Sequence, residues 1–135
     1  MAKSWVEKRD NGKVPRVVIL EKTFAGIPEG SKLLISSPQE IDAFIRKIPK
    51  GEVRTPADMR NALAENHNAD ATCPVSSGIF LRIVVQAALE ERAKGQKSAE
   101  ITPFWRIMLE GTAAAKKLTI DLEEVQLLRD MERVS

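Results

Sequence analysis

Two adjacent aromatic side chains, Phe104 and Trp105, are the first candidates for a functional site. They lie between Pro103 and Arg106, in a chain that has only four Phe, two Trp and no Tyr. An aromatic wall can stack a nucleobase. Neighbours on a strand face opposite sides, so one of the two rings is expected in the core. These four residues predict a pocket for a base, with no nucleophile among them.

Cys73 and His67 are the only residues of their types. A reactive thiolate needs a helix N-terminus or a nearby base, and Cys73 precedes a predicted helix start. A free cysteine is more often an inert, buried side chain, and we expect that here. One cysteine and one histidine do not make a zinc site, and His67 is expected in a solvated loop. We therefore expect no catalytic residue, no metal and no cofactor.

Polar and basic residues of the middle of the chain are candidates for contact with DNA. Arg82 and Gln86 share one face of a predicted helix, which either meets phosphates and base edges or is an ordinary solvated face. The basic residues Arg46 and Lys47 fall near a predicted helix C-terminus, where stabilisation of the helix dipole is the simpler explanation. The expected DNA contacts are Arg54, Thr55, Arg60, Ser76, Ser77, Arg82 and Gln86, and Lys50 extends the basic cluster.

The composition indicates one soluble globular domain. The 135 residues carry a net charge of +2, with 12 basic and 8 acidic residues in 1–60 and 9 and 11 in 61–135. This modest basic bias is compatible with a nucleic-acid partner. No apolar run is long enough for a membrane helix, and no apolar signal core follows the N-terminus. With a single cysteine, these features predict a cytoplasmic protein.

The first part of the chain predicts a short β unit and two helices. Residues 3–13 are expected to form a loosely held arm. Strands are expected at 14–20, as an edge strand because of Pro15, and at 32–36. Ser37 begins a helix that ends before Pro49, with Glu40 completing a capping box, and residues 55–58 repeat this pattern at the start of a second helix. Residues 66–70 are expected to form a polar loop.

The second part predicts a long helix, a hairpin and a last helix. The long helix begins at Ser76 or Ser77 and runs to about Lys94, with Gly95 as its terminator. Strands at 105–109 and 112–115 are expected to flank a turn at Glu110-Gly111. The last helix starts at Asp121. The expected buried residues are Ile79, Phe80, Ile83, Val84 and Ala87 in the long helix, and Leu122, Val125, Leu128 and Met131 in the last one.

This order of elements predicts an α+β fold, a winged helix-turn-helix with a short N-terminal β unit. Residues 1–36 are expected to form the arm and the short strands, and 37–135 the winged-helix domain. In helix-turn-helix proteins the second helix of the pair enters the major groove.

Two motifs resemble the C-terminal domain of alkylguanine-DNA alkyltransferases. Residues 48–55, IPKGEVRT, are similar to the family's IPxGxVxT/S entry to the helix-turn-helix, and 101–107, ITPFWRI, to its active-site strand IxPCHRV. Glu110-Gly111 fits the turn that follows, and Leu122-Glu123 and Leu127-Leu128 fit the LE…LL of the last helix. The resemblance covers about two thirds of the chain. It implies a fold that binds DNA and rotates a damaged base into a pocket.

The departures from the family pattern concern its chemistry. Phe104 replaces the acceptor cysteine and Trp105 the histidine that activates it, and neither ring can accept an alkyl group or relay a proton. Pro56 stands where the family has the tyrosine that assists base rotation. Arg82 corresponds to the arginine that fills the vacated stack. Loss of the acceptor cysteine is typical of alkyltransferase-like proteins, although their usual replacement pair is tryptophan and histidine.

The resulting expectation is a monomeric, non-enzymatic protein that binds double-stranded DNA and senses alkylated guanine, with a repair protein as a further partner. Two alternatives stay open. One is a regulatory or protein-interaction domain that kept the fold and lost DNA repair, which the acidic balance of residues 61–135 favours. The other is an alkyltransferase that uses Cys73.

Overall fold

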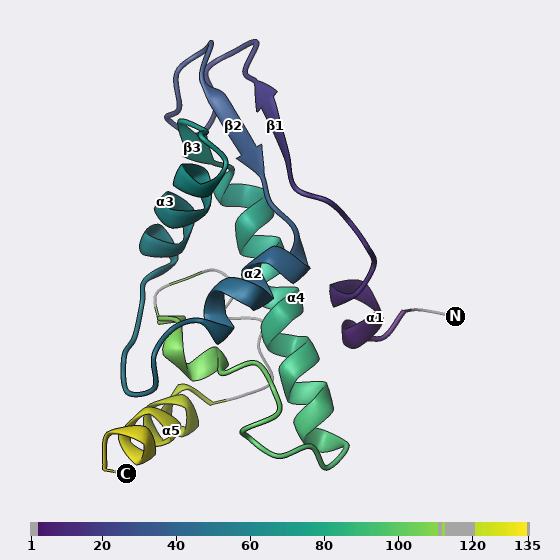
Figure 1. Ribbon diagram of the computed structural model, residues 1–135, viewed down its shortest axis with the longest axis vertical. Helices are drawn as coiled ribbons and strands as arrows, with labels where there is room; N and C mark the ends of the chain where they lie inside the picture. Colours follow the sequence, from purple (N-terminus) through teal and green to yellow (C-terminus); the bar gives the residue numbers. More distant parts are fainter. Residues whose placement is uncertain (1–2, 111, 113–120, 135) are drawn as a thin grey trace.

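The chain forms an α+β fold of five helices, one 3-10 helix and a small sheet within the part that the computed structural model describes, residues 3–110, 112 and 121–134. The elements are α1 (Trp5–Arg9), β1 (Arg16–Ile19), β2 (Lys32–Ile35), α2 (Pro38–Arg46), α3 (Pro56–Asn66), β3 (Ala71–Thr72), α4 (Pro74–Ala93), η1 (Phe104–Arg106) and α5 (Leu122–Val134). Figure 1 shows α4 running from the sheet at one end of the molecule to the loop before η1 at the other.

The sheet has the order β1-β2-β3. Both strands were predicted from the sequence, and β1 lies at the edge as expected. β1 and β2 pair antiparallel, with Val17 opposite Leu34. The sequence pattern missed β3, because its two residues are too few to alternate and their parallel partner β2 lies far away in the chain. β3 joins α3 to α4 and ties both helices to the hairpin.

The starts of α2 and α3 confirm the predicted caps. The Ser37 hydroxyl accepts a hydrogen bond from Glu40 N, and the Thr55 hydroxyl accepts one from Asp58 N. Asp58 completes a capping box by accepting from Thr55 N. Glu40 does not complete its predicted box, because its carboxylate accepts from the Ser36 hydroxyl and contacts His67 instead.

The N-terminal segment is a helix for much of its length, so the prediction of a loosely held arm is wrong. Ser4 and Glu7 form a complete capping box for α1. The Glu90 carboxylate of α4 accepts from Trp5 N, and Arg9, only 8% exposed, pairs with Glu91 at 2.7 Å. These contacts join residues that lie far apart in the chain. A short polar segment has no periodic apolar pattern from which they could be predicted.

Helix α4 begins three or four residues earlier than predicted, because Cys73 rather than Ser76 or Ser77 occupies its N-cap position. It ends as predicted before Gly95, whose φ is +99°. Phe80, Val84 and Ala87 of the predicted stripe are buried and Ile83 is half-buried. Ile79 is 56% exposed, so its expected burial is wrong. The principal helical partners of α4 are α1 and α2.

The strand predicted at 105–109 is wrong over most of its length. Phe104–Arg106 form the 3-10 helix η1, and only Ile107 makes a β-bridge, with Arg54. Two aromatic residues and an isoleucine favour a strand locally, but the carbonyls of this segment bond to α5 instead. The rest of the predicted hairpin, Gly111 and 113–115, lies outside the described residues. The α+β class is therefore established, and the winged helix remains an expectation.

Helix α5 packs through a narrower apolar face than the sequence predicts. Val125 is fully buried and Leu128 is half-buried. Leu122 and Met131 are 36% and 63% exposed, so their predicted burial is wrong. Arg129, 6% exposed, occupies the buried face beside Val125.

One core unites the elements. Leu34, Ile41, Ile45, Met59, Val84 and Phe104 are among its fully or almost fully buried members. None of the helices in the described ranges is both long enough and apolar enough to span a bilayer.

The cap of α3 gives a test of the fold. We expect Thr55→Ala to lower the free energy of unfolding by about 1 kcal/mol, because the amide of Asp58 loses its acceptor. Thr55→Ser keeps the hydroxyl and is expected to stay close to the wild type. Urea unfolding followed by circular dichroism measures both variants, and equal losses would contradict the assigned cap.

Candidate functional site

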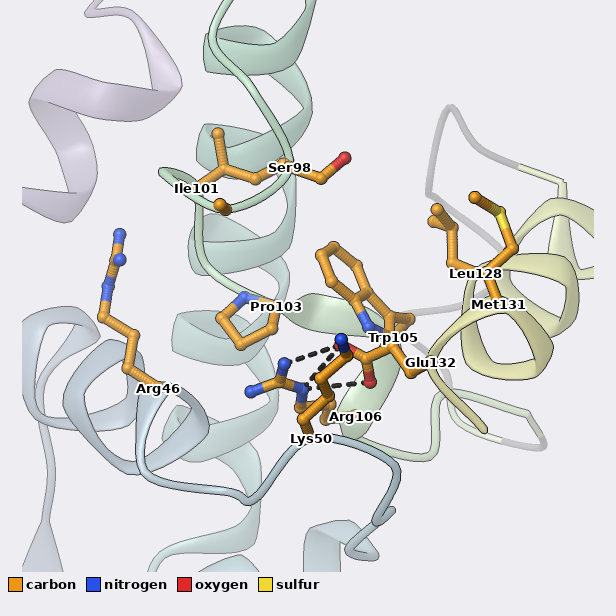
Figure 2. Close-up of a pocket in the computed structure, with 11 residues that line it drawn as sticks. Arg46, Lys50, Ser98, Ile101, Pro103, Trp105, Arg106, Leu128, Met131 and Glu132 are labelled. Atoms are coloured by element: carbon orange, nitrogen blue, oxygen red, sulfur yellow. Dashed lines mark hydrogen bonds and ion pairs between the residues drawn. The ribbon is translucent and has the colours of Figure 1, made fainter. Parts of the chain in front are cut away.

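A pocket of about 500 Å³ opens between the end of α2, the segment 98–106 and α5 (Figure 2). Three of the four predicted pocket residues, Pro103, Trp105 and Arg106, line it. Phe104 does not, because it is fully buried in the core. The remaining lining residues are Arg46, Lys50, Ser98, Ala99, Ile101, Leu128, Met131 and Glu132.

The 3-10 turn of η1 separates the two aromatic rings. Their centroids lie 5.2 Å apart with an interplanar angle of 79°, an edge-to-face contact. Phe104 thereby supports the Trp105 ring from the core side, while Trp105 forms one wall of the pocket. One ring in the core and one at the site is the outcome that the sequence predicts, although a helical turn rather than a strand produces it.

An ion pair between Arg106 and Glu132 forms another part of the pocket lining. Arg106 Nη2 lies 2.6 Å from Glu132 Oε1, and Arg106 Nη1 donates to the Ile48 carbonyl at 2.9 Å. Burial alone would raise the pKa of Glu132, but hydrogen bonds from Arg106, Trp105 and the Gly51 amide outweigh it and lower that pKa. The indole Nε1 of Trp105 is buried and makes no hydrogen bond of ordinary geometry, so its effect on the pKa of Glu132 is that of a nearby N–H. Arg106 is thus fixed in place rather than available to a phosphate.

Arg129 of α5 binds the backbone of η1 and of Ile107, which follows it. Its Nε donates to the Trp105 carbonyl at 2.6 Å, its Nη2 donates to the Ile107 carbonyl at 3.1 Å, and it pairs with Glu110 at 3.0 Å. Arg129 and Glu132 were not among the site residues predicted from the sequence. Their spacing places them on the helix face that carries Val125 and Leu128, which could have indicated a role at the site. Charged residues, however, normally indicate a solvated position.

The cationic side of the pocket comes from α2 and the loop that follows it. Arg46 pairs with Asp42 at 2.9 Å and donates to the Glu100 carbonyl, which anchors the segment 98–103 to α2. The Thr102 hydroxyl also donates to Asp42. Lys50 is exposed and also lines the pocket (Figure 2). Arg46 therefore does more than stabilise its own helix, which was the simpler expectation.

The predicted DNA contacts near α3 have structural roles of their own. Arg54 pairs with Glu52 at 2.8 Å and its amide donates to the Arg106 carbonyl. Thr55 caps α3. Arg60 is half-buried, and its carbonyl accepts from the Thr72 hydroxyl. None of these three residues lines the pocket.

The predicted DNA contacts on α4 are largely covered. Ser77 and Gln86 are 1% and 4% exposed, so neither can reach a groove of DNA as expected. Arg82 is half-buried and its guanidinium stacks 5.1 Å from the Trp5 ring. Ser76 is half-buried with its hydroxyl oxygen shielded from solvent. Helix α1 packs on α4 around Arg82 and Glu90.

Cys73 and His67 lie outside the pocket. Cys73 is buried and unpaired, as predicted, at the N-cap of α4. His67 is not simply solvated, because its Nε2 lies 2.5 Å from Glu40 and links the end of α3 to the start of α2. In the described ranges, no group of three His, Cys, Asp or Glu side chains has an arrangement that could hold a metal ion.

Comparison of the chain with protein-family models, with curated proteins and with solved structures gives no match.

The lowered pKa of Glu132 gives a test of the pocket. In the folded protein this pKa lies below its ordinary value of 4.5, so the charged carboxylate stabilises the fold above about that pH and loses this effect as the pH falls through the lowered pKa. We therefore expect Glu132→Gln to be less stable than the wild type at neutral pH, with a difference that shrinks in acid.

Urea unfolding at pH 7 and in steps below 4.5 measures this difference. Glu123→Gln changes an exposed carboxylate of the same helix and serves as the control. A difference for Glu132→Gln that does not change with pH would show that the residue acts through its shape rather than its charge.

Proposed function

We propose that the chain is a non-enzymatic DNA-binding protein that holds a nucleobase, with alkylated guanine as the preferred one, in the pocket beside Trp105. One observation carries the proposal. Pro103, Trp105 and Arg106, the residues that align with the base-handling motif, line a pocket of about 500 Å³ with cationic side chains on one side. That volume is in the range of pockets that enclose small ligands.

The walls of the pocket suit a flat, partly apolar ligand. Trp105 and Pro103 lie on one side, and Leu128 and Met131 of α5 on another (Figure 2). Stacking of a base on an aromatic side chain contributes about 1–3 kcal/mol. The flexible thioether of Met131 can adapt to an added alkyl group, which favours an alkylated base over a normal one.

The cationic side of the pocket suits the phosphates that flank such a base. Lys50 is exposed, and Arg46 keeps 41% of its side chain exposed despite its bond to Asp42. Arg54, in the following loop, does not line the pocket, and its side chain is 36% exposed and paired with Glu52. Phosphate contacts position a protein on DNA and supply the salt-dependent part of its affinity.

The composition of the pocket lining favours binding over group transfer. The described side chains that line it include no thiol and no imidazole. Cys73, the acceptor of the enzymatic alternative, is buried at the start of α4 and outside the lining. Among the described lining residues, an alkyl group would thus meet none of the thiol or imidazole groups that act in such transfers.

Trp105 provides a direct test of base binding. In a Trp5→Phe background Trp105 is the only tryptophan, so its fluorescence reports on the pocket alone. We expect a duplex with one alkylguanine to quench this fluorescence at lower concentration than the matched normal duplex. Equal curves for the two duplexes would remove the preference for alkylated bases, and no binding at low salt would overturn the proposal.

Lys50 tests the role of the cationic side. We expect Lys50→Glu to weaken duplex binding and to lower the slope of log K against log salt by about 0.9, the contribution of one phosphate contact. Lys22→Glu makes the same change of net charge on the exposed hairpin loop and is the matched control. Equal effects of both substitutions would indicate general attraction of DNA rather than a contact at the pocket.

One observation favours the second candidate, a protein-interaction domain. The solvent face of α4, which would read the DNA groove in a helix-turn-helix, is apolar at its start: Val75 and Ile79 are each 56% exposed. Exposed apolar residues at helical spacing are typical of protein contacts.

A further inference from the structure

The outer edge of β1 has free hydrogen-bonding groups. The Leu34 carbonyl accepts from Cys73 N on the β3 side, so Leu34 directs its backbone away from β1. Val17, paired with Leu34, therefore directs its own N–H and C=O away from β2, and Ile19 does the same two residues later. No strand of the described ranges pairs with this edge. Val17 and Ile19 can accept another strand.

The side chains of this edge are apolar and uncovered. Val17 and Ile19 are 40% and 60% exposed, and Val14, just before the strand, is 75% exposed. Directly paired residues share a face of a sheet, so Val17 lies on the same face as the core residue Leu34. β1 thus extends the core face of the sheet beyond the cover of the helices. Charged residues usually protect such an edge, and the strand itself carries only Arg16.

The start of α4 adds to the apolar surface. Cys73 N bonds to Leu34 O, which places the first turn of α4 one strand away from β1. Val75 and Ile79 follow on the exposed face of this turn. Gly78 lies between them in the sequence and leaves open space around its backbone. Lys13, in the segment before β1, lies 5.0 Å from the Phe80 ring and confirms that β1 approaches this part of α4.

We propose that two copies of the chain associate through their β1 strands, which pair antiparallel about a two-fold axis at Val18. In this register Val17 of each copy faces Ile19 of the other, and these residues exchange the hydrogen bonds that each edge lacks. The exposed apolar side chains of both strands then lie on one face of a joined sheet. Val14, Val75 and Ile79 enlarge the contact beyond the strands, as a stable interface requires.

Two other symmetric registers are possible, with the two-fold axis at Val17 or at Ile19. The residues in and beside β1 disfavour both of them. A two-fold axis at Val17 places Ile19 opposite Pro15, which has no N–H to donate. A two-fold axis at Ile19 places Arg16 opposite Lys22, and like charges in opposite positions are unfavourable. With the axis at Val18, Arg16 faces the uncharged Leu20. The free backbone groups and the apolar side chains of one copy thus match those of the other, which favours a second copy as the occupant.

The dimer replaces the expectation of a monomer and is independent of the proposed binding of DNA. The pocket lies at the end of the molecule where α2 and α5 meet, whereas β1 lies at the opposite end of α4 (Figure 1). Association through β1 leaves both pockets open. Each proposal can therefore fail without the other.

The mass in solution tests the dimer. We expect sedimentation equilibrium to give twice the 15.0 kDa of one chain at high protein concentration. Ile19→Lys is expected to return the mass to that of one chain, because it places a charge in the strand contact. Leu127→Lys, on α5, is the matched control, since Leu127 and Ile19 are both 60% exposed. It is expected to remain dimeric. A monomeric wild type, or a dimeric Ile19→Lys variant, would overturn the proposal.

A cross-link tests the register and does not depend on a charge. In the proposed pairing the two Val18 residues form a non-hydrogen-bonded pair with Cα atoms about 4.5 Å apart, within reach of a disulfide. We expect oxidised Val18→Cys to form a covalent dimer rapidly. Val17→Cys, whose two copies are offset by two residues, is expected to cross-link much more slowly. Equal rates, or no cross-link at position 18, would contradict the register.

Discussion

The guanidinium of Arg129 is the interaction on which the candidate site depends. It is 6% exposed, and a buried charge is tolerated only when its hydrogen bonds are satisfied. Two of its acceptors are the carbonyls of Trp105 and Ile107, and Glu110 supplies the balancing charge. These carbonyls lie in the segment 105–107, whose only sheet-like pairing in the described residues is the bridge between Ile107 and Arg54. The bonds from Arg129 therefore satisfy carbonyls that no strand partner in the described residues satisfies. Arg129 therefore fixes η1, and with it the wall of the pocket, to α5.

The rest of the pocket follows from polar contacts of the same kind. Arg106 binds Glu132 and the Ile48 carbonyl, and the backbone of Arg54 bonds to Arg106 and Met108. Three segments distant in the chain, the loop 48–54, the segment 106–108 and α5, are thus joined around one turn. Apolar packing alone could not do this, because Val125 is the one fully buried apolar side chain in the described part of α5. The geometry of the pocket is consequently specified by directional bonds, which is what a site needs to hold a flat ligand in one orientation.

The sequence predicts the parts of this molecule that local rules determine. The caps at Ser37 and Thr55, the strands around Val17 and Leu34 and the end of α4 at Gly95 all follow from neighbouring residues. It does not predict η1, whose residues favour a strand until Arg129 binds their carbonyls. Nor does it predict that α1 covers Gln86 and stacks on Arg82, since that cover comes from another part of the chain. The candidate site was therefore found at the aromatic pair, while the expected groove-reading face of α4 was not.

Helix α4 separates the two surfaces that have a candidate partner. Its 20 residues span about 30 Å, from the turn bonded to β2 to the loop that reaches the pocket. One end presents a pocket with cationic side chains, and the other an apolar edge without a covering element in the described ranges. In the proposed dimer, the two-fold axis at Val18 is perpendicular to the joined sheet, so the helices and the pockets of both copies lie on the same face of that sheet. If both proposals hold, two linked sites would bind one long duplex more tightly than a single site does, because the second contact becomes intramolecular. The proposed dimer would then compensate for the modest basic character of each copy.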